Sequence, residues 1–366
     1  MAQRPTILVE WDLRFKYYAA GIVRTIRFLG WRLLGLVPSK VNRRVLVDSH
    51  PFPDVPGHGR VVQYQGRTIV EPKYGWAIAA PASLLRDSLT HGDSIHTWKG
   101  REWIGLPPLT GLARRRPLEH VGCAISLMSP WPENYYHFVF DVLPKLCVLD
   151  DNGLLDPSQH YLVADVLFES RFFKSAIRHG RLASLEFRAV STPLRTDDLV
   201  VPDTTPVDAD VAASMRSLLG VADMMPVAEH SKIFLTRGEH RGRTLRSMGA
   251  LRAEWEQLGY RTVDVDGLTF SEQVSMFRGA SHIAAIHGAC LANLVWCEPG
   301  AVVVTELVPT VDSGEFDCFQ RLCADLAIPL YRVFGNDTKY AHKRASFDVD
   351  RDALRVALTA AEGARV

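Results

Sequence analysis

Residues 283–306 read IAAIHGACLANLVWCEPGAVVVTE, and this stretch decides the fold. It holds an apolar run ending at Ile286, the turn His287-Gly288-Ala289, a short helix carrying Asn293, and a second apolar run ending at Glu306. An apolar strand that stops at a glycine turn and opens a helix is typical of α/β folds. The first N–H groups of such a helix and its positive end point at the turn, which favours a phosphate there. The stretch therefore predicts an α/β layer with an anion site.

The same alternation surrounds this stretch in the second half of the chain. Strands are expected at 232–236, 261–265, 282–286, 301–306 and 330–333, with helices that begin near Ser247, Ser271, Ala289 and Phe316. Ser247 and Ser271 are natural N-caps, and Gly259 is a natural helix stop. Right-handed crossovers would then give a Rossmann-like sheet.

The first half begins with short strands and continues as an α/β layer. Val61–Tyr64 and Thr68–Val70 read as a hairpin around Gln65-Gly66, and 95–98 as another strand. Beyond these, strands are expected at 121–128, 161–163 and 185–190, and helices from 134, over 168–178 and after 207. A linker at 223–230 separates the halves, and the helix 351–361 is expected to pack back on the first domain.

These patterns divide the chain into four parts. They are an amphipathic helical segment (1–40), a first α/β domain with a β-rich beginning (41–225), a second, Rossmann-like domain that carries the expected anion site (226–346) and a C-terminal helix (347–366).

The amino-acid composition argues against several classes of function and favours others. Of 366 residues, 47% are hydrophobic and 23% charged, which is typical of a folded soluble protein of about two domains. The formal net charge of +1 gives no reason to expect nucleic acid as a partner. The six cysteines lack the paired spacing of a zinc site and the density of a disulfide scaffold, so they are expected to be reduced core thiols. No cofactor is expected, and without a cleavage site or spanning helix the prediction is a cytoplasmic protein.

Residues 11–37 form a basic amphipathic pattern. Apolar residues recur there at helical spacing, with Lys16, Arg24, Arg27 and Arg32 between them. Two interpretations stay open: the helix docks on its own domain, or it lies on an anionic membrane surface at the inner face of the membrane.

In an open parallel sheet, ligands bind beyond the carboxyl ends of the strands. The loop from Arg237 to Arg243 follows the first strand of the second half and suits a diphosphate, although a solvated charged loop is the alternative. His287, Gly288 and Ala289 follow the third strand. Asn293 either contacts the bound ligand or bridges loops. Glu306 either accepts from a ribose diol or pairs with an arginine.

The first half contributes a histidine–aspartate pair. His137 and Asp141 are four residues apart, so on a helix they share a face and Asp141 can orient the imidazole. The pair is either a general base or a buried structural hydrogen bond. No third metal ligand accompanies it, and Asp-x-Asp occurs three times, at 208–210, 264–266 and 348–350, so no metal is predicted.

Together, several pieces resemble glycosyltransferase family 61. They are Asn134-Tyr135-Tyr136-His137 with Asp141 and Leu143-Pro144, the 237–243 loop, Ser271-Glu272-Gln273, Ile286-His287-Gly288-Ala289 with Leu291 and Asn293, and Val304-Thr305-Glu306-Leu307. Cys290 departs from the family pattern, which has glycine there. The resemblance implies a GT-B fold, in which two Rossmann-like domains face each other across a cleft, and inverting transfer from a nucleotide sugar.

The leading hypothesis is a metal-independent inverting glycosyltransferase of surface or capsular polysaccharide synthesis. A UDP-sugar is the first expected donor and a glycan or polysaccharide the acceptor. His137 or Asp141 is the expected base, and Arg237, Arg243, His287, Gly288, Ala289, Asn293 and Glu306 are expected to bind the donor. The alternative is a non-catalytic nucleotide-sugar or polysaccharide-binding subunit of a membrane-associated complex.

Overall fold

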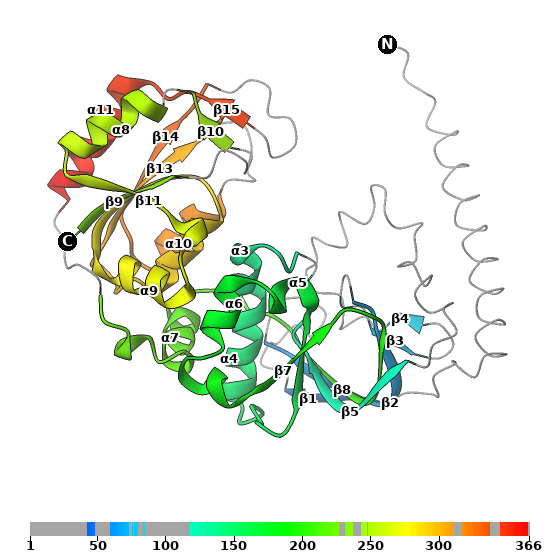
Figure 1. Ribbon diagram of the computed structural model, residues 1–366. Helices are drawn as coiled ribbons and strands as arrows, with labels where there is room; N and C mark the ends of the chain where they lie inside the picture. The colour runs from blue at the N-terminus through cyan, green and yellow to red at the C-terminus, as the bar shows by residue number, and fades with distance from the viewer. Residues whose placement is uncertain are drawn as a thin grey trace, which may run out of the picture. The chain divides into compact units, whose positions relative to one another are not determined.

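The computed structural model (Figure 1) describes residues 42–47, 59–72, 75, 77–79, 83–84, 118–129, 131–226, 231–236, 243–246, 248–310, 317–336 and 345–364. The chain forms two compact units, called unit 1 and unit 2. Unit 1 takes Met1–Pro132, Val148–Phe168 and Leu185–Thr205; unit 2 takes Glu133–Cys147, Glu169–Ser184 and Pro206–Val366. Each has its own sheet with parallel strands, which confirms the α/β class. The GT-B arrangement and the domain boundaries given above stay predictions.

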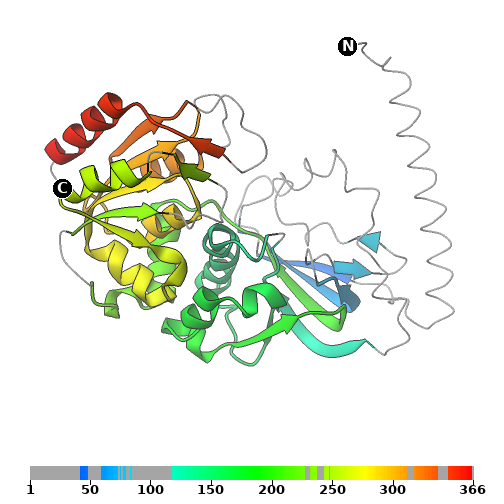
Figure 2. The ribbon, with the colours of Figure 1, turned by 45° about the horizontal axis from the view of Figure 1, so that its top comes forward.

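Unit 1 is built on one mixed sheet, whose strands run side by side in Figures 1 and 2. Its strands are β1 (Asn42–Val47), β2 (Val61–Val70), β3 (Ala77–Ala79), β4 (Ser83–Leu84), β5 (Glu119–Ser126), β6 (His160–Ala164), β7 (Glu186–Val190) and β8 (Leu194–Pro202). The order is β4-β3-β2-β8-β5-β6-β7, with β1 beside β2. The strands from β8 to β7 pair in parallel and β1–β4 pair antiparallel, which confirms a β-rich beginning followed by an α/β layer.

Two strand predictions in unit 1 are wrong. The expected hairpin at Gln65-Gly66 is one continuous strand, β2, because a register shift against β8 between Gln65 and Thr68 absorbs the glycine. The strand pattern also misses β8, where Asp197 and Asp198 interrupt the apolar alternation. Each aspartate has a partner on a neighbouring strand: Gln63 donates to the Asp198 Oδ2 at 2.7 Å, and His120 pairs with Asp197 at 2.7 Å.

Unit 2 contains an all-parallel sheet in the order β11-β9-β12-β13-β14. The strands are β9 (Ser231–Thr236), β11 (Tyr260–Asp264), β12 (Ala280–Ile286), β13 (Val303–Val308) and β14 (Leu330–Phe334), which confirms all five predicted strands. A two-stranded parallel sheet, β10 (Arg243–Leu245) with β15 (Ala345–Phe347), accompanies it. The order reverses between β9 and β12, which is the position where open parallel sheets usually bind a ligand.

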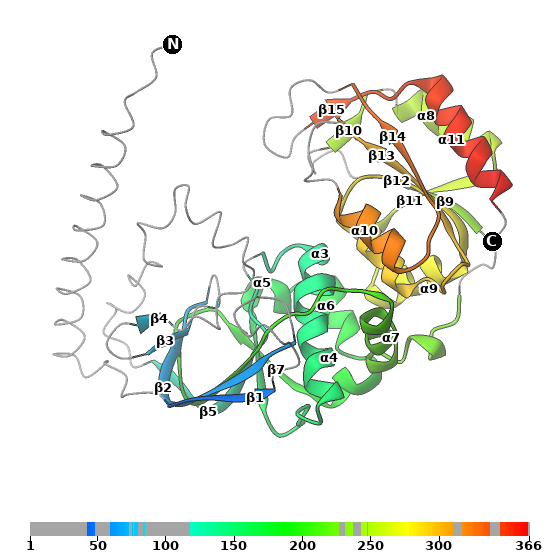
Figure 3. The same cartoon turned by 180° about the vertical axis from the view of Figure 1, so that it is seen from behind.

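Helices cover both faces of this sheet (Figures 1 and 3). They are α8 (Met248–Gln257), α9 (Phe270–Gly279), the 3-10 helix η8 (Ala289–Trp296), α10 (Cys318–Asp325) and α11 (Arg351–Gly363). Leu307 of β13 shares a core with Trp255 of α8 and Leu354 of α11. The prediction that the last helix packs on the first domain is therefore wrong, because its apolar face completes the core of unit 2.

The helix starts are only partly as predicted. α9 begins at the N-cap Thr269 and not at Ser271, because Thr269 forms a capping box with Glu272. Gly259 follows α8 with φ +82°, as the predicted stop requires.

The expected helix 168–178 is two helices, α5 (Asp165–Phe168) and α6 (Arg171–Ala176), because Ser170 caps the second one. The helix after Val207 is α7 (Ala209–Leu218). Ser247 and Phe316 lie outside the described residues.

Aromatic side chains hold residues 133–147 in unit 2. This segment forms α3 (Tyr135–His137), the π-helix η4 (Phe138–Val142) and the start of α4 (Leu143–Asp151). The buried Phe138 ring lies 5.8 Å from Phe173 and 6.3 Å from Phe270, between ring centroids. Phe270 in turn meets Trp296 of η8 at 5.4 Å. The cluster joins α3 and η4 to α6, α9 and η8.

The amphipathic segment 11–37, the strand 95–98 and the end of the linker 223–230 lie outside the described residues. Within the part of the chain that the structure describes, none of the helices combines the length and apolar character needed to cross a membrane.

Gly180 stands where no other residue fits without strain. It has φ +51°, and a Cβ there would lie 2.2 Å from the Leu218 carbonyl oxygen. We expect Gly180→Ala to lower the free energy of unfolding by about 2–4 kcal/mol, since the left-handed conformation and the clash both cost free energy. Urea denaturation measures this change. Gly153→Ala is the matched control, with φ +66° and open space around its Cβ, and an equal loss in both variants would contradict the close approach.

Candidate active site

A proline shapes the helix that carries the histidine–aspartate pair. Asn134 caps the helix by accepting the Tyr136 N–H at 3.0 Å. Pro144 cannot donate a backbone hydrogen bond and crowds the carbonyl four residues earlier. The chain widens into a π-turn just before it, where the Leu143 N–H bonds to the Phe138 carbonyl, five residues back. Such turns are frequent at functional sites.

His137 and Asp141 form the expected pair. The His137 Nδ1 lies 2.9 Å from the Asp141 Oδ2, and the side chains are 18% and 0% exposed. Because a carboxylate only accepts, Nδ1 donates its hydrogen to Asp141. In this tautomer Nε2 carries the lone pair and is the basic nitrogen of the ring. The predicted shared helix face is confirmed.

Two aromatic rings connect this pair to the turn after β12. Tyr136 stacks on Phe140 with ring centroids 4.4 Å apart and meets the edge of His137 at 5.3 Å. It also contacts Phe319 of α10 at 5.8 Å, and Phe319 contacts His287 at 5.1 Å. Burial, with the nearby Cys318 and Asp141, raises the pKa of the Tyr136 hydroxyl, which therefore stays protonated. The two sequence-predicted histidines thus lie at the two ends of one series of ring contacts within unit 2.

His287 contacts the buried carboxylate of Glu306, which in turn pairs with Arg332. Its Nδ1 lies 2.6 Å from the Glu306 Oε1, and the Arg332 Nε donates to the Glu306 Oε2 at 3.0 Å. Glu306 is fully buried, and Arg332 is 13% exposed. Burial, with the negative charge of Glu306, raises the pKa of the neighbouring Cys323 thiol to about 12, so that thiol stays neutral. The arginine pairing proposed for Glu306 is confirmed, whereas its role toward a ribose stays a prediction.

Arg332 was not among the site residues predicted from the sequence, although one signal was present. In the predicted strand 330–333, Arg332 is the one charged residue. On β13 and β14, Glu306 and Arg332 are paired in register, so their side chains share a face of the sheet.

Asn293 bridges elements inside unit 2. Its amide donates to the Gln273 side chain at 2.9 Å and to the Cys290 carbonyl at 3.0 Å. Its oxygen accepts from the Tyr135 hydroxyl at 2.6 Å and from the Trp296 indole at 3.0 Å. Fully buried, with all four of its usual hydrogen bonds made, Asn293 fits the bridging interpretation better than a donor contact.

The other expected donor-binding residues are only partly described. Gly288 is extended at φ 174°, so the backbone there does not demand glycine, and Ala289 begins η8. Cys290, where the family has glycine, is buried against the site. Arg243 pairs with Ala345 through the β10–β15 ladder, and Arg237 lies outside the described residues. Their donor-binding roles stay predictions.

Each of the three Asp-x-Asp motifs supplies a helix cap. Asp208 caps α7, Asp264 caps the short 3-10 helix η7 (Val265–Gly267), and Asp350 caps α11. Within the described ranges, no group of three or more His, Cys, Asp or Glu side chains is arranged to hold a metal ion.

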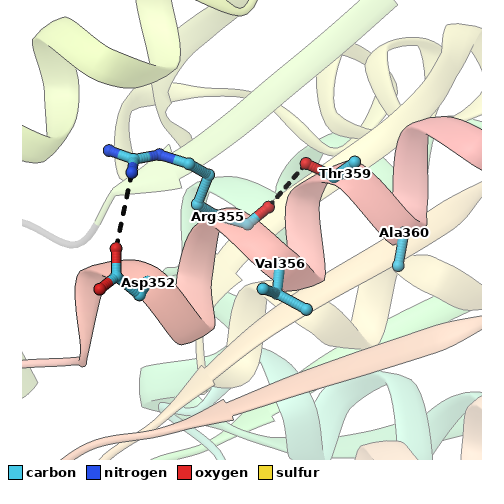
Figure 4. Close-up of a pocket in the computed structure, with 5 residues that line it drawn as sticks. All are labelled: Asp352, Arg355, Val356, Thr359 and Ala360. Carbon is cyan, nitrogen blue, oxygen red and sulfur yellow. Dashed lines mark hydrogen bonds and ion pairs between the residues drawn. The ribbon is translucent and has the colours of Figure 1, made fainter.

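A surface pocket on α11 is separate from these residues (Figure 4). It is lined by Asp352, Arg355, Val356, Thr359 and Ala360 of that helix alone. Arg355 already pairs with Asp352 at 3.5 Å, and Thr359 donates to the Arg355 carbonyl at 2.9 Å. The pocket brings together none of the candidate site residues.

A comparison with protein families matches the model described as Glycosyltransferase 61 to residues 135–304. The match begins in α3 and ends in β13, so it contains His137, Asp141, His287 and Asn293, while Glu306 and Arg332 lie just beyond it. No curated protein matches the chain. The match confirms the resemblance found in the sequence. Residues 135–304 are therefore a glycosyltransferase family 61 region, and this family implies glycosyltransferase activity.

Proposed function

We propose that the protein transfers a sugar from a nucleotide sugar, first of all a UDP-sugar, to a glycan or polysaccharide acceptor with inversion. One observation carries this proposal. His137, supported by the fully buried Asp141, lies in the same compact unit as His287, and Tyr136 and Phe319 connect the two histidines. Family membership supports sugar transfer as the reaction class.

His137 is the proposed base, and Asp141 its support. Asp141 is fully buried, so a substrate hydroxyl cannot reach it without displacing the imidazole. The His137 Nε2 takes the proton of the acceptor hydroxyl as the hydroxyl oxygen attacks the anomeric carbon. The bond from that carbon to the nucleoside diphosphate breaks in the same displacement, and a single displacement inverts the anomeric centre. The negative charge of Asp141 stabilises the imidazolium that forms.

The leaving diphosphate is proposed to bind beyond the carboxyl end of β12. His287 follows that strand, and the N–H groups of Gly288 and Ala289 open η8. Hydrogen-bond donors at such a position stabilise the negative charge that grows on the leaving diphosphate. Arg237 and Arg243 complete the site in this proposal, and no metal is needed.

The proposal also covers the class of acceptor and the location of the protein in the cell. We place the reaction in surface or capsular polysaccharide synthesis at the cytoplasmic face of a membrane, with residues 11–37 as a peripheral contact. Flotation of the full-length chain with anionic vesicles, compared with a chain lacking residues 1–40, tests the membrane part.

A nucleotide-sugar panel tests the function. We expect one donor to raise the apparent melting temperature, because a ligand that binds only the folded state stabilises it by mass action. The same donor should support transfer to a glycan acceptor, with an unchanged rate in EDTA. Matching free nucleotides without the sugar serve as controls. Binding of a donor with no transfer across many acceptors would favour the non-catalytic subunit, and loss of transfer in EDTA would contradict metal independence.

A further inference from the structure

We infer that Arg332 is a positioning residue for sugar transfer, and that through Glu306 it holds the His287 imidazole in one orientation and one tautomer. The inference rests on the proposed function, since His287 acts on a donor only if the protein transfers sugar. Both Glu306 and Arg332 lie outside the region that defines the family match.

The geometry begins with the sheet register. Glu306 on β13 pairs with Arg332 on β14, while the His287 N–H donates to the Leu307 carbonyl at 2.9 Å just past the end of β12. The three side chains therefore come from three neighbouring strands at one end of the sheet. Leu307 and Val333, the next residues along β13 and β14, point to the opposite face and pack in the core under α8 and α11.

Arg332 also contacts residues at the start of α10. The Arg332 Nη1 donates to the Asp317 Oδ1 at 3.1 Å and to the Gln320 Oε1 at 2.7 Å. Arg332 is therefore fixed by groups on three sides: a carboxylate on β13, the N-cap residue of α10, and the first turn of that helix. An arginine held in this way places the Glu306 carboxylate within a narrow range of positions.

The consequence for His287 is chemical. With Glu306 ionised, the His287 Nδ1 must carry the hydrogen of the 2.6 Å contact, so Nε2 is the ring atom that presents a lone pair or, in the imidazolium, a second N–H. Arg332 holds one oxygen of this carboxylate, Oε2, and leaves the other, Oε1, to the histidine. Without Arg332, the carboxylate loses the partner that sets its direction.

A purely structural role does not explain these contacts well. A buried ion pair adds little stability compared with apolar side chains of the same volume, because desolvation offsets the attraction. On the same face of the sheet, the positions two residues away are apolar: Val304 and Val308 on β13, and Leu330 and Phe334 on β14. This face therefore accepts apolar side chains. A carboxylate placed behind a histidine, in contrast, is the usual way to fix an imidazole tautomer.

Arg332→Gln tests the inference by two readouts. One is the ¹⁵N NMR spectrum of histidine-labelled protein, in which His287→Gln identifies the His287 ring signals. We expect the wild-type ring to show the Nδ1–H tautomer and the Arg332→Gln ring a mixture. The other readout is steady-state transfer, where kcat should fall about 10–100-fold with the acceptor KM unchanged, as when a histidine's second partner is removed. Arg332→Lys should recover part of both. Arg252→Gln, which breaks an exposed pair with Glu256 on α8, is the matched control.

The outcomes separate this inference from the proposed function. A folded Arg332→Gln protein with the wild-type tautomer and wild-type kcat overturns the positioning role, even if the protein transfers sugar. A wild-type protein that transfers no sugar overturns the proposed function, whereas the NMR comparison still decides whether Arg332 sets the tautomer. If Arg332→Gln does not fold, Arg332→Lys serves in its place, because it keeps the buried positive charge and Glu306 but loses the guanidinium that contacts Glu306, Asp317 and Gln320 together. A mixed tautomer with a lowered kcat in that variant supports the inference, and a wild-type tautomer with a wild-type kcat contradicts it.

Discussion

The His137→Ala protein is expected to lose about 10²–10⁴-fold in kcat while it binds the nucleotide-sugar donor nearly as the wild type does. The reason is the position of the imidazole, which is 18% exposed and held at 2.9 Å by a fully buried carboxylate. Removing the ring removes the proton acceptor and leaves the turn after β12 intact. Initial rates at saturating donor and acceptor measure kcat, and a thermal shift with the donor measures binding.

A second histidine–aspartate pair provides the control. His120 lies 2.7 Å from Asp197, with side chains 40% and 51% exposed, on the sheet of unit 1. His120→Ala removes the same chemical groups from a solvated surface and should leave kcat within about twofold, as surface substitutions usually do. A wild-type kcat for His137→Ala would show that the pair is structural and that another group takes the proton.

Asn293→Ala is expected to lower the free energy of unfolding by about 3–5 kcal/mol, because it leaves several buried hydrogen-bonding groups without their partner. Among them are the Tyr135 hydroxyl and the Trp296 indole, which donate to the Asn293 oxygen at 2.6 and 3.0 Å. Burial raises the pKa of Tyr135, so its hydroxyl stays a donor that needs an acceptor. The midpoint of urea denaturation, followed by tryptophan fluorescence, measures the loss.

The control for this variant is Asn152→Ala. Asn152 is exposed and donates to the Val148 carbonyl at 2.8 Å, so its loss should cost about 1 kcal/mol or less. If Asn293→Ala keeps the wild-type free energy of unfolding but binds the nucleotide-sugar donor more weakly, the donor-contact interpretation of Asn293 is correct.

The parallel sheet of unit 2 was predictable because each strand is a short apolar run between helix signals. The stretch 283–306 alone gives two neighbouring strands and the turn between them, and the spacing of His137 and Asp141 gives their shared face. Unit 1 was harder to predict. β8 contains two aspartates whose partners, Gln63 and His120, come from neighbouring strands far away in the sequence.

The sequence predicted individual residues of the candidate site but not the contacts between their side chains. Glu306 and His287 were each expected from their places at the ends of predicted strands, although β13 continues past Glu306 to Val308. The contact between them depends on the register of β12 against β13, which no local pattern shows. The same holds for Arg332 and its pairing with Glu306. Thr269 became the cap of α9 in place of Ser271 because Glu272 stands three residues after it, a pairing that the sequence does contain.

The interrupted path of the chain through unit 2 has a consequence for folding during synthesis. Residues 133–147 and 169–184 leave the ribosome before β9 to β14 exist, yet their aromatic side chains belong to the core that those later strands help to build. Contacts so distant along the chain form late, after the loops between them have closed. We therefore expect the helix bearing His137 to stay accessible to chaperones and proteases on the nascent chain, and to become protected only after the last strands of unit 2 have emerged.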